Sequence, residues 1–307
     1  MVGRHNPLWK EEILEATPEK LEAAPKNSEK ARLNVIAGWR HGLPFAVWIG
    51  ILFGVMIFNL AFDPTNEHAL NLFTYAERYA AMTVLGAIAL LICRPWRYYG
   101  PLQIKNILPA IGIGIAVIFF WVVFETDTMR LYLPWVAEFY ERWMTMPFGE
   151  IASEEAMVCW KGCVVNEVVI VDGVEELVAV ACDNVAHAYK YSPAVAGWPL
   201  VFMRIIGSAF VIAIIEEFFW RGWLYRFFQH LDFLDVNIGK MHLWAYLGVA
   251  VLFGMEHREY VIGILTGLAW GYFVIRTRDL WAACISHVTA NLVLAIYVLT
   301  TGNYRFW

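Results

Sequence analysis

The sequence predicts an all-α integral membrane protein with seven or eight transmembrane helices around an intramembrane cavity, and a small extramembrane insertion near residues 150–190. Three observations predict this class. Hydrophobic residues make up 60% of the chain and charged residues 17%, whereas soluble domains average about 45–50% and about 25%. The mean hydropathy is +0.52. Several apolar runs approach the roughly 20 residues that a helix needs to cross a bilayer.

The N-terminal segment, residues 1–42, is polar. It carries seven Lys/Arg and six Glu and lacks the apolar core of a cleavable signal peptide. We therefore expect the first apolar run, which begins at Leu43, to remain as a span. The net charge of −5 argues against nucleic acid as a partner.

The apolar runs define the expected spans. They are Leu43–Phe62, Tyr79–Cys93, Ile107–Phe124, Trp198–Ile215 continuing to Phe228, Leu243–Met255, Tyr260–Ile275 and Leu280–Leu299. A weaker candidate, Met129–Phe148, contains Glu138, Glu141 and Arg142, which also fit a helix in the membrane interface. This candidate decides between seven and eight spans.

The loop charges predict the orientation of the first spans. The loop Asp63–Leu70 has no Lys or Arg, and the next loop has Arg94, Arg97 and Lys105. Because Lys and Arg concentrate in cytoplasmic loops, we expect a cytoplasmic N-terminus in a multi-pass protein of the cell (inner) membrane. The orientation of the last four spans stays open.

Four regions follow from this division of the chain. We expect a cytoplasmic segment at 1–42, N-terminal transmembrane helices at 43–148, an extramembrane insertion at 149–195 and a catalytic transmembrane core at 196–307. The insertion is rich in Val and has an Asp-Gly turn signal at Asp172, so it predicts a β-hairpin. Its cysteines either form one disulfide or stay free thiols; they are Cys159, Cys163 and Cys182.

Polar residues interrupt the last spans. They are Glu216, Glu217 and Arg221 in one span, Glu256 and His257 at the end of the next, and His287 and Asn291 in the last. Charged residues inside spans are costly and usually line a cavity or pathway. The four-residue spacing of Glu217 and Arg221 allows an ion pair on one helix face, which leaves Glu216 for chemistry.

Each of these residues also has a purely structural interpretation. Glu217 with Arg221 is a plausible ion pair, His257 fits the headgroup level, and a His–Asn pair can join membrane helices. The combination of carboxylate, two imidazoles and amide instead favours activation of water and stabilisation of an oxyanion. We expect the glycines at four-residue spacing in the sixth span to serve helix packing; they are Gly263, Gly267 and Gly271.

The order of these residues resembles a known family. EEFFWR at Glu216, FGMEH at Phe253 and HVTAN at His287 match EExxxR, FxxxH and HxxxN of the CAAX protease and bacteriocin-processing family of intramembrane glutamic endopeptidases. This similarity to type II CAAX prenyl endopeptidases covers about Arg204–Leu299. It implies hydrolysis of a peptide bond of a membrane-associated, in some cases lipidated, protein or peptide, without a cofactor or metal.

The resemblance also implies roles. Glu216 is the general base, His257 and His287 orient water and shuttle protons, Asn291 with His287 stabilises the oxyanion, and Glu217 and Arg221 support the site. Glu256 departs from the pattern, because an uncharged residue is expected there; it either alters the histidine's proton affinity or faces water. YYGPLQIKNILPAIGIGIAV, from Tyr98, faintly resembles the subgroup associated with exosortase and PEP-CTERM sorting systems.

Three alternatives stay open. A zinc metalloprotease would bind the metal through Glu216, His257 and His287. A proton-coupled transporter would use the same groups as a relay, and a scaffold would keep them for structure. A catalytic site also requires the three side chains to reach one depth, which demands a tilted, broken or unusually long helix around Glu216.

Overall fold

The computed structural model describes residues 18–62, 75–145, 164–171, 174–181 and 192–307. The α-helices are α2 (Pro18–Phe62), α3 (Tyr75–Cys93), α4 (Ile107–Val123), α5 (Asp127–Tyr132), α6 (Pro134–Trp143), α9 (Pro193–Ala196), α10 (Trp198–Ile205), α11 (Ala213–Glu217), α12 (Tyr225–Phe227), α13 (Leu243–Met255), α14 (Tyr260–Thr277) and α15 (Leu280–Thr301). Short 3₁₀ helices lie at Pro95–Tyr98, Ile104–Asn106, Phe233–Asp235 and Tyr304–Phe306.

Within the part of the chain that the structure describes, five helices are long and apolar enough to cross a membrane by length and composition. They are Glu77–Tyr98, Ile104–Val123, Trp198–Phe227, Tyr260–Thr277 and Leu280–Thr301. The predicted span Leu43–Phe62 is the last part of α2, and α13 is a shorter apolar helix that begins and ends at the predicted residues. The all-α class predicted for the membrane region is therefore confirmed.

The weaker candidate Met129–Phe148 is not a single helix. Its described part consists of α5, with 6 residues, and α6, with 10 residues, separated at Leu133. A 10-residue helix is about 15 Å long, half the thickness of a bilayer core. The interfacial interpretation of this segment therefore fits better than an eighth span.

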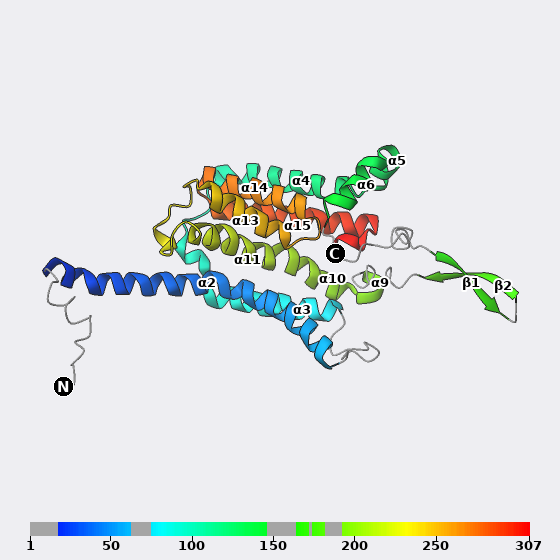
Figure 1. Cartoon of the computed structure of the whole chain (residues 1–307), viewed down its shortest axis with the longest axis horizontal. Helices are drawn as coiled ribbons and strands as arrows, with labels where there is room; N and C mark the ends of the chain where they lie inside the picture. Colours follow the sequence, from blue (N-terminus) through cyan, green and yellow to red (C-terminus); the bar gives the residue numbers. More distant parts are fainter. Residues whose placement is uncertain (1–17, 63–74, 146–163, 172–173, 182–191) are drawn as a thin grey trace, which may run out of the picture.

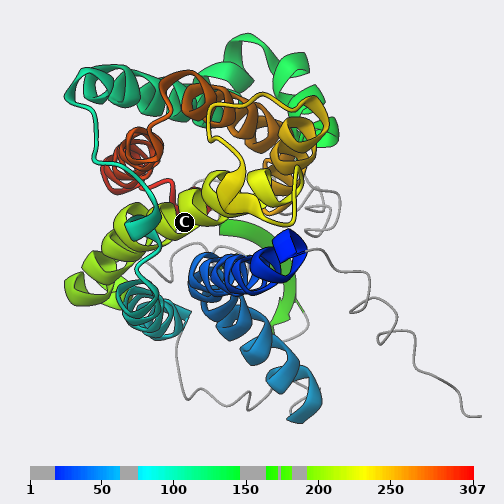
Figure 2. The same ribbon diagram turned by 90° about the vertical axis from the view of Figure 1, so that its left-hand side faces the viewer.

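The long helices run side by side, as Figure 1 shows. Viewed from one end in Figure 2, the helix formed by α10 to α12 lies between α2 and α3 on one side and the group of α4, α13, α14 and α15 on the other. The main contacts join α13 with α14, α4 with α15, and α2 with α3. This arrangement surrounds the residues Glu216 to Arg221 with protein.

The outer faces of these helices are apolar. Leu91, Ile92 and Leu108 expose 61%, 73% and 80% of their surface. Exposed side chains of this size along whole helices are expected where lipid, rather than water, is the surrounding solvent. The structure thus agrees with an integral membrane protein.

The predicted β-hairpin is present. Strand β1 (Val164–Val171) pairs antiparallel with β2 (Val174–Ala181), with Val171 opposite Val174. The pair lies beyond the end of the bundle where α9 lies (Figure 1). The Asp-Gly turn and the three cysteines of this region are outside the described residues.

Glycines allow close helix approach, as predicted. A Cβ at Gly263 would lie 2.9 Å from the Cα of Gly254, and a Cβ at Gly267 would lie 2.9 Å from the Cα of Ala250. Both contacts join α14 to α13. The absence of a side chain at these positions lets the two backbones meet.

A matched pair of glycines in α4 tests this packing. A Cβ at Gly114 would lie 2.4 Å from the carbonyl oxygen of Ser286 on α15, whereas a Cβ at Gly112 would meet nothing within 4 Å. Gly114→Ala is expected to lower the free energy of unfolding by about 1–3 kcal/mol through overpacking. Gly112→Ala should leave it unchanged or raise it slightly, because alanine favours helix. Unfolding in detergent micelles measures both; equal effects would contradict the packing.

Candidate active site

The helix that carries the two glutamates is unusually long. It extends over 30 residues, Trp198–Phe227, or about 45 Å. Two π-helical segments, Ile206–Ile212 and Phe218–Leu224, lie on either side of α11 and its two glutamates. Segments of π-helix are frequent at functional sites because they shift the register of side chains around the helix. The expected unusually long helix is therefore present, with irregular turns next to Glu216.

Helix lengths place the predicted residues within about 10 Å of one another in depth. Measured from the same end of the bundle, His257 is about 21 Å from Leu243, Glu216 is about 17 Å from Phe227, and His287 is about 11 Å from Leu280. The short α13, with 13 residues, leaves His257 well inside the bundle's length rather than at its far end.

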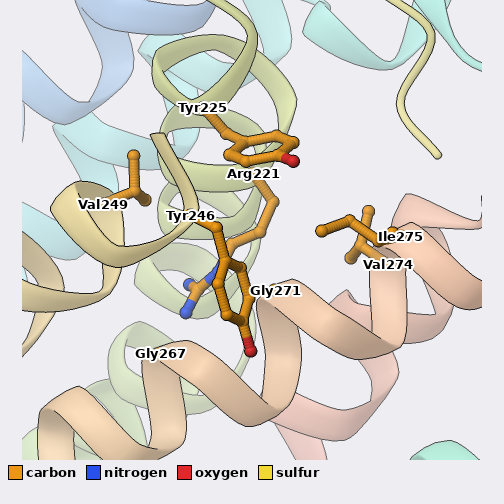
Figure 3. Close-up of a pocket in the computed structure, with 8 residues that line it drawn as sticks. All are labelled: Arg221, Tyr225, Tyr246, Val249, Gly267, Gly271, Val274 and Ile275. Carbon is orange, nitrogen blue, oxygen red and sulfur yellow. The ribbon is translucent and has the colours of Figure 1, made fainter. Parts of the chain in front are cut away.

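The predicted ion pair is present and buried. Nη1 of Arg221 donates to Oε1 of Glu217 at 2.9 Å, and the two side chains are 2% and 0% exposed. The guanidinium also lies over the ring of Phe253, 4.3 Å from its centroid. Figure 3 shows Arg221 extending from its helix toward Gly267 of α14, beside Tyr246.

Glu217 has a second partner that the spacing did not predict. Its Oε1 lies 3.0 Å from Nδ1 of His287 on α15. Because the carboxylate accepts, Nδ1 carries the proton, and in the neutral imidazole Nε2 then has a free lone pair. Glu217 therefore fixes the tautomer of His287 as well as pairing with Arg221.

Glu216 faces the other side of the same imidazole. Its Oε2 lies 4.0 Å from Nε2 of His287. Glu216 is 7% exposed, and Oε2 has no hydrogen-bond partner among the described residues. A carboxylate oxygen and an imidazole lone pair are both acceptors, so this pair is stable only with a donor hydrogen between them.

His257 lies close to Glu216 and His287 but forms no direct hydrogen bond with either in the described part of the chain. Its Nδ1 is 2.8 Å from the carbonyl oxygen of Phe253, so Nδ1 donates and Nε2 again has the lone pair. The Phe253 ring is 4.8 Å from the His257 ring and 6.3 Å from the His287 ring. Over the part of the chain that the structure describes, no hydrogen bond or ion pair joins His257 to Glu216.

Asn291 contacts the glutamate helix at a different point. Its Nδ2 donates to the carbonyl oxygen of Ser208 at 2.7 Å, within the first π-helical segment. Each amide nitrogen has two hydrogens, so one remains for another acceptor. The structure thus places Asn291 on the same side of α15 as His287, four residues further along.

Two further residues belong to the site's surroundings. The Trp270 ring lies 4.2 Å from the His287 ring, and its Nε1 donates to Oγ of Ser286 at 2.8 Å. No motif distinguishes Trp270 from the other aromatic residues of the spans, so the sequence offered no signal for it. Glu256, the departure from the family pattern, follows the last residue of α13. The residue is exposed, but its carboxyl group lies near enough to Trp220 and Glu216 to interact with both.

The metal-binding alternative finds limited support. Both histidines donate through Nδ1 and present Nε2, which is how metal-ligating histidines are usually held. However, within residues 18–62, 75–145, 164–171, 174–181 and 192–307 no group of three or more His, Cys, Asp and Glu side chains is close enough to hold a metal ion.

The fold and this buried cluster define a class: a multi-span helical membrane protein with a carboxylate–imidazole site between its helices. Residues 198–293 match the family model described as type II CAAX prenyl endopeptidase Rce1-like, so this part of the chain is similar to the CAAX protease family. The matched segment contains every predicted site residue, from Glu216 to Asn291. No curated protein and no solved structure matches the chain.

The match agrees with the resemblance seen in the sequence, which extended over about Arg204–Leu299. A family of proteases implies a hydrolase that acts on a membrane-associated protein. The match does not reach Tyr98 and the residues after it, so the similarity to the exosortase-associated subgroup stays a prediction.

Proposed function

We propose that the chain is an intramembrane glutamic endopeptidase, in which Glu216 activates water to hydrolyse a peptide bond of a membrane-associated protein or peptide. The observation that carries this proposal is the 4.0 Å approach of Oε2 of Glu216 to Nε2 of His287, two acceptors held face to face. Water supplies the donor hydrogens that this pair requires, one to each acceptor.

Glu217 and Arg221 orient the His287 imidazole for binding this water. The bond from Nδ1 of His287 to Glu217 keeps the Nε2 lone pair directed at Glu216. The charge of Arg221 compensates the charge of Glu217, which offsets the cost of burying the carboxylate among apolar side chains. Both residues act on the site through His287 rather than on the substrate.

The reaction then follows ordinary general-base hydrolysis. Glu216 takes a proton from the water while the water oxygen attacks the peptide carbonyl carbon. The proton passes to the leaving nitrogen as the C–N bond breaks, which yields a carboxylic acid and an amine. The free N–H of Asn291 stabilises the oxyanion, and His287 adds a second donor once its Nε2 has received the proton from Glu216; His257 orients the water through Nε2.

The substrate is a membrane-associated protein or peptide. The matched family description names prenyl endopeptidases, which makes a lipidated substrate one candidate beside unlipidated membrane peptides. The proposal needs no cofactor and no metal.

The proposed location is the cell membrane, with a cytoplasmic N-terminus. Three loops and the first part of α2 meet at one end of the bundle: Gln103 bonds to Asp279, Arg226 to Tyr99, and Leu234 to Asn34. Exposed cations gather in these loops and at the adjoining end of α14: Arg94, Arg97, Lys105, Lys240, Arg276 and Arg278. Such an excess supports the cytoplasmic assignment of this end.

Comparison of cellular protein termini tests the proposed activity. Cells that produce the active protein are compared with cells that produce Glu216→Gln, and the new termini of membrane proteins are identified by mass spectrometry. We expect a set of membrane-protein termini that depends on Glu216. Identical termini in both cells would contradict the proposal, and the sequences around the new termini would identify the substrate class.

Chelation separates the glutamic from the zinc mechanism. Because no metal takes part in the proposed mechanism, cleavage of a substrate found in this way is expected to survive exhaustive chelation, as measured with purified protein in liposomes. Loss of cleavage that one equivalent of zinc restores would instead establish the metalloprotease, with Glu216, His257 and His287 as ligands.

A further inference from the structure

The surface of α6 is divided into three sectors. Ala137 and Tyr140 are buried against the bundle, both 3% exposed. Trp135, Phe139 and Trp143 form a second sector, exposed by 69%, 51% and 59%. The third sector consists of the exposed charges Glu138 and Arg142. On a helical wheel the apolar and the charged exposed sectors lie next to each other.

The apolar sector continues the outer surface of a membrane helix. Helix α4 exposes Ile115, Phe119 and Phe120, by 49%, 58% and 53%. It ends at Val123, four residues before α5 begins. The exposed Leu131 of α5, at 74%, follows directly. Exposed apolar side chains are therefore found on a candidate span and on both of the helices that follow it.

The pair of helices is held firmly against the bundle. The Tyr140 ring stacks on Phe124 with centroids 4.9 Å apart, and the hydroxyl of Tyr260 donates to the carbonyl oxygen of Trp143 at 2.7 Å. An ion pair between Arg130 and Glu141 joins α5 to α6. These contacts determine which sectors point outward, and they attach α6 to the start of α14, next to the turn that carries His257.

We propose that α5 and α6 lie in the lipid–water interface of the bilayer that the long helices cross. Trp135, Phe139 and Trp143 enter the boundary between headgroups and acyl chains. Glu138 and Arg142 remain in the aqueous headgroup layer.

Two physical preferences support the membrane interface as the surroundings of these helices. Aromatic side chains, tryptophan above all, concentrate at the membrane interface, and amphipathic helices lie there with their apolar face in lipid. The guanidinium of Arg142 lies 5.7 Å from the Trp143 ring, an arrangement that suits a cation at the edge of a buried aromatic surface. A water-soluble partner would not explain why the candidate span α4, directly before this pair of helices, exposes side chains of the same kind.

Depth measurements on two neighbouring positions test the inference. In a background without native cysteines, Phe139→Cys and Glu138→Cys are labelled with a small fluorophore and reconstituted in phosphatidylcholine–phosphatidylglycerol liposomes. Quenching by iodide in the water is compared with quenching by nitroxide on the acyl chains. The label at 139 is expected to respond mainly to the lipid nitroxide, and the label at 138 mainly to iodide.

Every other pattern overturns the inference. Iodide quenching at both positions would place the two helices in water, and lipid quenching at both would place them within the bilayer. Protection from both quenchers would mean that protein covers the surface. Equal melting temperatures of the labelled variants in detergent verify the fold, and Trp135→Cys replaces Phe139→Cys if that variant melts early. Because no cleavage is measured, the outcome is independent of the proposed protease activity.

Discussion

Arg221→Ala is expected to destabilise the protein by about 3–5 kcal/mol, because it leaves a buried carboxylate without its counter-charge. Glu217 is fully buried, and its Oε1 receives the Arg221 hydrogen bond at 2.9 Å. The substitution also removes the guanidinium that packs on Phe253. The loss is measured as the change in the free energy of unfolding in mixed detergent micelles.

A double variant controls for the loss of packing. Glu217→Gln with Arg221→Met removes both charges and keeps similar volumes, and the Gln side-chain oxygen can still accept from Nδ1 of His287. Since buried ion pairs are often replaceable by neutral groups, its stability should lie much closer to that of the unchanged protein. If Arg221→Ala alone were as stable as the double variant, the ion pair would not hold the site together.

Some features were predictable because they depend on local spacing. The Glu217–Arg221 pair follows from four-residue spacing within one helix, and α13 begins and ends at the predicted residues because apolar runs define membrane helices. The Val-rich segment with its Asp-Gly turn likewise predicted the hairpin of β1 and β2.

Other features depend on contacts between distant segments. The bond from Glu217 to His287 spans 70 positions in the sequence, and Glu217 could equally have used only Arg221. The π-helical segments beside α11 could not be predicted from composition, because the residues of Ile206–Ile212 are typical of any apolar helix. Met129–Phe148 was ambiguous because its charges fit both interfacial helices and a costly span, and the break between α5 and α6 at Leu133 favours the interfacial helices.

The largest effect on activity is expected from Glu216→Gln. Glutamine has nearly the same shape as glutamate but cannot accept a proton from water, so cleavage should fall by about 10²–10⁴-fold, the range supplied by a general base. The protein should remain folded, because a neutral amide replaces a buried carboxylate whose Oε2 has no hydrogen-bond partner in the described part of the chain. This combination distinguishes Glu216 from Arg221, whose loss is expected to lower stability.

Single-turnover cleavage of an identified substrate in liposomes measures the effect, with the free energy of unfolding determined on the same preparation. Glu138→Gln makes the same chemical change at an exposed carboxylate of α6 and is expected to cleave at the normal rate. His287→Ala should lose cleavage as Glu216→Gln does, because it removes the second acceptor that holds the water. Normal cleavage by Glu216→Gln would show that another group is the base, since an amide in its place cannot take the proton.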